Sequence, residues 1–200
     1  MSLKYYITTP IYYVNDVPHI GHAYTTLACD VMARFKRLDD FEVFFLTGTD
    51  EHGQKVETAA KNKQLNPKDF VDEVSVNFRN LLDCMHFSNN DFIRTTEKRH
   101  FESCQKIWNK LVENGNIYLG KYSGWYAVRD EAFFLESEIV DGKAPSGAPV
   151  EWVEEPSYFF NLSKWQDKLL KYYEDNKDFI CPNSRRNEVV NFVKSGLKDL

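Results

Sequence analysis

The chain has few cysteines, and their spacing argues against both a disulfide framework and a zinc finger. The four lie far apart and form no Cys-x-x-Cys pair: Cys29, Cys84, Cys104 and Cys181. Disulfide-rich secreted domains and structural zinc sites both depend on closely spaced cysteines. We therefore expect four reduced thiols, most of them packed in the interior.

The sequence also lacks long apolar runs and an excess of basic residues. No stretch approaches the roughly 20 apolar residues that a membrane-spanning helix needs. Residues 1–4 lead directly into a predicted strand and leave no room for a signal or transit peptide. With 25 Lys and Arg against 30 Asp and Glu, the net charge of −5 argues against a large nucleic-acid footprint. We expect a cytoplasmic protein with no membrane contact.

What the sequence does contain is a regular alternation of strand and helix patterns. Strands are predicted at 5–9, 41–46 and 91–95, and helices at 23–38, at 54–64, from Pro67 onward and at 97–114. Asn66 is the predicted cap of the helix at Pro67. An apolar core stripe follows on that helix: Phe70, Val74, Phe78, Leu81, Leu82 and Met85. This order predicts an α/β fold with a parallel, doubly wound sheet.

The tetrapeptide His19-Ile20-Gly21-His22 lies where the first strand gives way to the first helix. Free backbone N–H groups and the helix dipole favour an anion at such a position, and glycine allows close approach of the main chain. Two imidazoles there can donate hydrogen bonds to a phosphate. Two alternatives remain open: ordinary polar residues at a helix start, or a metal pair, which needs further ligands nearby.

A second polar segment, residues 47–53, follows the second predicted strand. Ligands of open α/β sheets bind beyond the carboxyl ends of the strands. We therefore expect Asp50 and His52 to project into the same crevice as His19 and His22. An alternative for Asp50 is a cap on the helix that starts near Gln54.

After Gly115 the pattern changes to short strands separated by turns, predicted at 117–119, 122–128, 150–153 and 157–160. We expect Trp125 and Tyr126 to belong to the core of this β-rich part. Helices are predicted from Ser163, as cap, to about residue 176, and again at 187–197.

Four segments together resemble the methionyl-tRNA synthetases, a family of class I aminoacyl-tRNA synthetases: residues 5–26, 44–53, 91–96 and 186–189. The resemblance implies the first half of a Rossmann-like (HUP) nucleotide-binding fold with a β-rich connective insert. It assigns residues 1–115 to the catalytic domain and 116–162 to the insert. Residues 163–200 become a helical segment that leads to the second half of the catalytic domain. In the family that half, the KMSKS loop and the anticodon-binding domain follow, so we interpret the chain as an N-terminal fragment.

The resemblance also implies a reaction and the residues that carry it. Methionine is activated by ATP with Mg²⁺ to methionyl-adenylate and is then transferred to tRNA(Met), which the family binds mainly through its C-terminal domain. His19 and His22 are the implied catalytic and ATP-binding residues, and Gly21 leaves space for the adenosine. They end the family's signature region: Tyr12, Tyr13, Val14, Asn15, Asp16, Val17, Pro18, His19, Ile20, Gly21 and His22.

For methionine, the family places the side-chain pocket on Pro10, Ile11 and Tyr13, and pairs Asp50 with the substrate ammonium. The roles of Tyr12, Asn15 and Asp16 stay open, and Arg94 either reaches the crevice or forms a surface ion pair. Zinc-bearing members carry cysteine pairs in the insert. This chain has Ala127 and Asp130 at the first pair and no Cys or His within 142–147, so no zinc is expected.

Two other functions are compatible with the sequence. One is a different nucleotidyltransferase that shares the His-x-Gly-His site. The other is a non-catalytic module that keeps part of the ATP and methionine site and binds ATP, tRNA or a partner. Methionine-dependent ATP–pyrophosphate exchange distinguishes an enzyme from a binding module.

Overall fold

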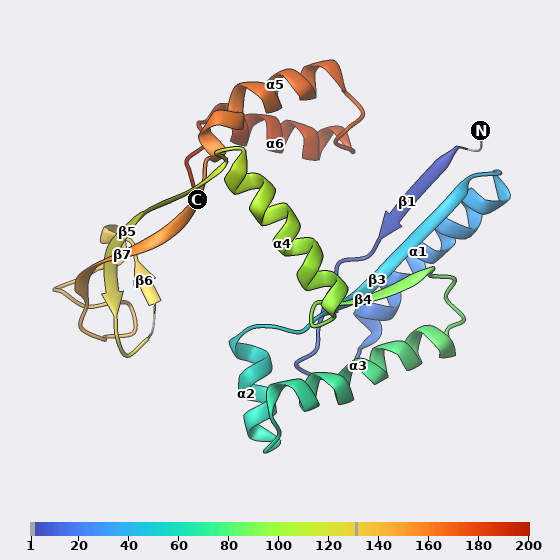
Figure 1. The fold of residues 1–200 in the computed structure, drawn as a ribbon, viewed down its shortest axis with the longest axis horizontal. Helices are drawn as coiled ribbons and strands as arrows, with labels where there is room; N and C mark the ends of the chain where they lie inside the picture. The colour runs from blue at the N-terminus through green and yellow to red at the C-terminus, as the bar shows by residue number, and fades with distance from the viewer. Residues whose placement is uncertain (1–2, 131) are drawn as a thin grey trace. The chain divides into compact units, whose positions relative to one another are not determined.

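The computed structural model describes residues 3–130 and 132–200 and divides into two compact units, Met1–Gln105 and Lys106–Leu200. Figure 1 shows the elements in chain order. The first unit contains β1 (Lys4–Thr8), β2 (Tyr12–Tyr13), α1 (Ile20–Leu38), β3 (Glu42–Asp50), α2 (Gln54–Asn62), α3 (Pro67–Cys84) and β4 (Asp91–Arg94). Helix α4 (Lys98–Glu113) carries the chain into the second unit.

The sheet of the first unit is parallel throughout, which confirms the predicted α/β fold. Strand β3 is central: β1 pairs with its first half, from Lys4 opposite Glu42, and β2 pairs with its last residues on the same side. On the other side β4 pairs from Asp91 opposite Leu46. The predicted strand 41–46 was too short, because the β-branched threonines beyond it continue the pairing to Asp50.

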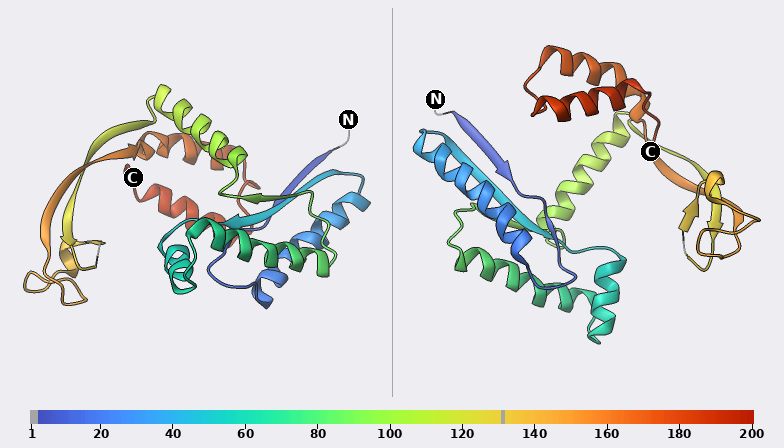
Figure 2. Two further views of the ribbon diagram at one scale, coloured as in Figure 1. Left: turned by 60° about the horizontal axis from the view of Figure 1, so that its bottom comes forward. Right: turned by 180° about the vertical axis from the view of Figure 1, so that it is seen from behind.

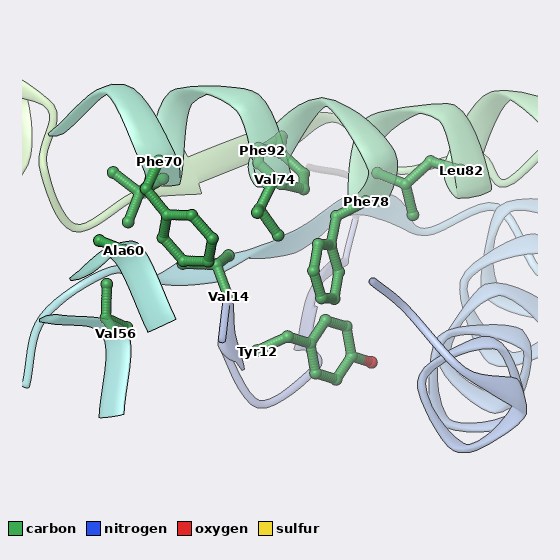
Figure 3. Close-up of a cluster of buried hydrophobic side chains, with 10 residues drawn as sticks. Tyr12, Val14, Val56, Ala60, Phe70, Val74, Phe78, Leu82 and Phe92 are labelled. Atoms are coloured by element: carbon green, nitrogen blue, oxygen red, sulfur yellow. The ribbon is translucent and has the colours of Figure 1, made fainter. Parts of the chain in front are cut away.

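Helix α1 packs against β3 and β1 and runs along β3 in both views of Figure 2, whereas α3 packs against α2. The largest core cluster lies between α2, α3 and the sheet (Figure 3). Of the predicted stripe, Phe70, Val74, Phe78 and Leu82 are buried, whereas Met85 is exposed at the end of α3. Asn66 caps α3 as predicted, accepting a 2.9 Å bond from the backbone N–H of Asp69.

The second unit contains a three-stranded antiparallel sheet of β5 (Ile117–Ala127), β6 (Ala132–Phe134) and β7 (Glu151–Phe160). The expectation of short strands was wrong, because β5 and β7 pair without interruption from Ile117 opposite Phe160 to Tyr126 opposite Glu151. The buried centre is made of small residues, Ala127, Ala144 and Ala148. Trp125 and Tyr126, expected in the core, are only half-buried.

Three further expectations for this part of the chain need correction. Ser163 does not cap a helix: it lies in the 3₁₀ turn Leu162–Trp165, and its backbone N–H donates to Asp199, so α5 (Gln166–Asp175) begins later. The last helix, α6 (Asn183–Lys194), begins before residue 187. The unpaired cysteines are not mostly packed, since only Cys29 is half-buried and the others are exposed.

One further feature concerns membranes. Among the described residues, no helix combines the length and the apolar character that crossing a bilayer requires.

Candidate nucleotide-binding site

The two histidines lie at the N-terminus of α1 and cap it reciprocally. His19 is the N-cap residue, with extended backbone angles, and its Nδ1 accepts the backbone N–H of Gly21 at 3.1 Å. His22, three residues on, accepts the backbone N–H of His19 on its own Nδ1 at 3.0 Å. This is a capping box in which imidazoles replace the usual hydroxyl and carboxylate. It satisfies two of the donors that a helix start leaves free.

This capping fixes the protonation of both rings. Because each Nδ1 accepts a backbone hydrogen bond, each neutral ring carries its proton on Nε2. Within residues 3–130 and 132–200, neither Nε2 has a hydrogen-bond partner. The rings stack with centroids 3.9 Å apart and planes inclined by 27°. Partial burial, together with the neighbouring His19, lowers the pKa of His22 and favours its neutral form.

Gly21 makes room for the His19 ring. A Cβ atom at position 21 would lie 2.9 Å from Cε1 and 3.0 Å from Nδ1 of His19, closer than nonbonded carbon atoms approach. The resemblance implied that Gly21 leaves space for the adenosine. The contact that the structure shows is with the imidazole.

Tyr12 packs against the His22 ring. The sequence alone left the role of Tyr12 open. Its ring meets His22 edge-on, with centroids 4.7 Å apart, and stacks on Phe78 of α3 (Figure 3). Its hydroxyl forms a 2.9 Å hydrogen bond with Thr26, whose hydroxyl bonds the carbonyl of His22. Burial raises the pKa of Tyr12. In the sequence, this role of Tyr12 was indicated only by an aromatic residue before the helix and a threonine one turn after His22.

A cavity of about 450 Å³ opens beside these histidines. Residues of the signature region line it: Ile11, Tyr12, Tyr13, Asn15, Asp16, Val17, His19 and His22. Of the three residues predicted to form the pocket for the methionine side chain, Ile11 and Tyr13 lie in this lining and Pro10 does not. The volume is within the range of small-molecule sites.

Asp50 ends β3 and lies opposite Tyr13 in the β2–β3 pairing. It is half-buried and is not part of the lining of the histidine cavity. The alternative role as a helix cap was wrong, because α2 starts from Gly53 and no side chain bonds its first turn.

His52 lies apart from the histidine pair. It lines a separate cavity of about 290 Å³, together with Glu51, Pro67, Lys68, Val71, Thr96 and Phe101. Its Nε2 is 3.4 Å from the carbonyl oxygen of Thr95. The expectation of one crevice for both motifs was therefore wrong for His52, and Asp50 likewise does not line the histidine cavity.

Arg94 was expected either to reach the crevice or to form a surface ion pair. It forms an ion pair, but the pair is buried. Its guanidinium bonds Glu51, a carboxylate with a fully buried side chain, at 2.7 Å. No role was expected for Glu51 from the sequence. The only available signal was a charged residue immediately after a buried strand.

No metal site is evident in the described part of the chain, where no group of three or more His, Cys, Asp or Glu side chains could hold an ion. At the position of the family's cysteine pairs, Asp130 accepts a hydrogen bond from Ser146. Arg129 donates to the carbonyl of Ser146 at 2.7 Å. Hydrogen bonds thus connect the segment at residues 129–130 with the loop that contains Ser146.

Comparison with known families agrees with this parallel sheet and with the histidine pair at the start of its first helix. The family described as tRNA synthetases class I (M) matches residues 5–151, well over half of the chain. The chain therefore belongs to the class I tRNA synthetases.

Its relatives within that class are methionine–tRNA ligases. Those of Rickettsia conorii and Rickettsia felis are each 70% identical over 201 residues, which cover 100% of this chain and 40% and 39% of the relatives. A solved structure, Mycobacterium tuberculosis methionyl-tRNA synthetase bound by methionyl-adenylate, is 50% identical with a TM-score of 0.82. It is matched over 98% of this chain and 40% of its own length. The chain thus spans about 40% of the length of the relatives it matches.

Proposed function

We propose that this chain forms the first part of a methionine–tRNA ligase and contributes its ATP-binding and methionine-binding residues. The observation that carries the proposal is the stacked pair of imidazoles at the start of α1, which line a cavity and whose Nδ1 atoms are both taken by backbone hydrogen bonds. The similarity to the enzymes of Rickettsia and to the adenylate-bound mycobacterial structure supports methionine and ATP as substrates.

The proposed reaction has two steps. A carboxylate oxygen of methionine attacks the α-phosphorus of ATP, and the bond to the β-phosphate breaks to release pyrophosphate. The terminal ribose hydroxyl of tRNA(Met) then attacks the methionyl carbonyl, and AMP leaves. His19 and His22 donate from Nε2 to phosphate oxygens, and the positive end of α1 adds to the stabilisation of the negative charge that grows there. No side chain acts as a nucleophile.

Methionine binds next to this pair in our proposal. Pro10, Ile11 and Tyr13 provide an apolar wall with an aromatic edge for the thioether. The Asp50 carboxylate pairs with the substrate ammonium from the end of β3. Gly21 keeps the His19 ring in place and leaves room for the adenosine.

Several finer assignments complete the proposal. Mg²⁺ accompanies ATP, and no zinc is bound, since hydrogen bonds among Arg129, Asp130 and Ser146 occupy the position of the cysteine pairs. We divide the chain into the first half of the catalytic domain (1–115), the connective insert (116–162) and a helical segment (163–200). The enzyme is cytoplasmic, without membrane contact, and binds tRNA mainly outside this chain.

The test uses a chimera in which this chain replaces the matching segment of the Rickettsia conorii enzyme. His19→Asn and His22→Asn should each lower methionine-dependent ATP–pyrophosphate exchange by about 10²–10³-fold, because each removes one donor to the transition state. His100→Asn is the matched control, since His100 lies on α4 and, among the described residues, its ring contacts Cys104 and Phe101 of the same helix. The control should keep full exchange.

Unchanged exchange in both histidine variants, or a chimera without methionine-dependent exchange, would contradict the proposal. For the 200-residue chain alone we expect ATP and methionine binding without turnover, because it spans only part of its relatives. Isothermal titration calorimetry with each ligand measures this binding.

A further inference from the structure

A buried carboxylate, Glu51, connects the ends of two neighbouring strands. Its side chain has no exposed surface. One carboxylate oxygen, Oε1, accepts from the Thr49 hydroxyl at 2.8 Å and from Nε of Arg94 at 2.7 Å. The other, Oε2, accepts from Nη2 of Arg94 at 3.0 Å and from the Thr96 hydroxyl. The backbone N–H of Glu51 donates to the buried Thr95 hydroxyl at 2.8 Å.

The same network extends to the helix layer. Arg94, which ends β4, binds Glu51 with two nitrogens and also reaches Asp72 on α3. Its guanidinium is held between these two carboxylates with little exposure. A planar bidentate pair fixes both distance and orientation, which a single charge contact does not. The ends of β3 and β4 and the start of α3 are therefore held at one point.

Asp50 is the residue immediately before this point. Successive side chains of a strand point to opposite faces, so Asp50, the last residue of β3, points away from the face of the buried Thr49, which bonds Glu51. Asp50 itself is half-buried and lies opposite Tyr13. Within the described residues its carboxylate accepts no hydrogen bond. Its position depends on the backbone that Glu51 holds.

We propose that Glu51 and Arg94 are positioning residues that hold the Asp50 carboxylate where it meets the ammonium group of the amino-acid substrate. This inference rests on the proposed function and extends it to two residues that do not touch the substrate. A buried ion pair is in general no more stabilising than well-packed apolar residues of similar size. Its value at this place is the fixed geometry of the strand end.

The test measures steady-state exchange kinetics in the chimera. Glu51→Gln and Arg94→Lys should raise the KM for methionine about tenfold and leave the KM for ATP within about twofold. Asp91→Asn is the control, because Asp91 also forms a two-point ion pair with an arginine, Arg99, but a more exposed one at the opposite end of β4. The control should leave both KM values unchanged. Equal changes in the two KM values for Glu51→Gln would overturn the inference.

A double-mutant cycle with Asp50→Asn shows whether Glu51 acts through Asp50. If it does, adding Glu51→Gln to Asp50→Asn causes no further rise in the KM for methionine, whereas independent roles multiply the two effects. Thr95→Val removes a single hydrogen bond to the Glu51 backbone and provides a milder variant if Glu51→Gln fails to fold. It should raise the KM for methionine selectively, and an unchanged value would count against the inference.

The outcomes separate this inference from the proposed function. If the chimera shows exchange that depends on His19 and His22, while the Glu51 and Arg94 variants bind methionine normally, only the inference fails. If exchange is absent or independent of both histidines, the proposed function fails as well.

Discussion

At the residue scale, the proposed site depends on two imidazoles that bond the protein through Nδ1 and, in our proposal, a ligand through Nε2. Nδ1 of each ring accepts a backbone N–H of α1, and this leaves Nε2 with the proton. A lysine or arginine could not do both, because neither side chain can accept a hydrogen bond. The same arrangement of the two rings therefore caps the helix and leaves two Nε2 donors for another partner.

Gly21 gives a sharp test at this scale. Gly21→Ala should change helix stability little, because the gain of about 1 kcal/mol in helix propensity is offset by the loss of the His19 cap, which is worth a similar amount. It should nevertheless lower pyrophosphate exchange in the chimera at least tenfold, about 1.4 kcal/mol, because the new Cβ displaces the His19 ring. Urea unfolding and exchange assays measure the two effects. Exchange at the wild-type rate would show that the ring tolerates the methyl group.

At the scale of elements, the site depends on how closely β3 and β4 approach. Gly48 lies opposite Ile93, and a Cβ atom at position 48 would lie 2.0 Å from the carbonyl oxygen of Ile93. The obstacle is backbone, which cannot rotate away. The strand ends that carry Asp50, Glu51 and Arg94 therefore depend on this glycine, although it lies outside the cavity.

Gly48→Ala should lower the free energy of unfolding of the chain by about 3 kcal/mol, because the two strands must separate. Gly124→Ala is the comparison, since its Cβ would meet a ring carbon of Phe133 at 3.0 Å and that side chain can turn. Its cost should be clearly smaller. Chemical denaturation followed by circular dichroism measures both, and equal midpoints would contradict the argument.

At the scale of the whole molecule, apolar surface remains exposed on the first unit. A stripe at helical spacing runs along α1: Ile20, Tyr24, Leu27, Val31, Phe35 and Leu38. On the sheet, Phe45 is fully buried while the adjacent Phe44 and its partner Tyr6 are exposed and stacked. Within the described residues, β1 and β4 each pair with β3 alone and leave two open edges. Contiguous apolar surface and open strand edges both favour association.

We therefore expect the 200-residue chain to self-associate in a concentration-dependent manner. Val31→Lys combined with Phe35→Glu should shift it toward monomer without unfolding it, because both side chains are more than half exposed. Val140→Lys, at an equally exposed site outside the stripe, should have no such effect. Sedimentation velocity over a range of concentrations measures this, and a monomer at every concentration would contradict the expectation.

The sequence was most informative where local chemistry is self-sufficient. The alternation of elements, the Asn66 cap and the histidine pair at a helix start all follow from patterns within a few residues. Prediction was less successful where partners are distant. Long-range pairing merges the predicted short strands into β5 and β7, and Asp199, far along the chain, takes the backbone N–H of Ser163.

The sequence by itself determined the parallel α/β class, the histidine pair at a helix start and the family to which the chain belongs, because these depend on residue type and local spacing. Only the tertiary structure decided which nitrogen of each histidine accepts a backbone hydrogen bond, that His52 lines a different cavity, and that Arg94 is bound to Glu51. The reason is physical: a hydrogen bond or a buried ion pair forms between groups that the fold brings together. Residues 43 positions apart along the chain leave no local pattern that announces such a contact.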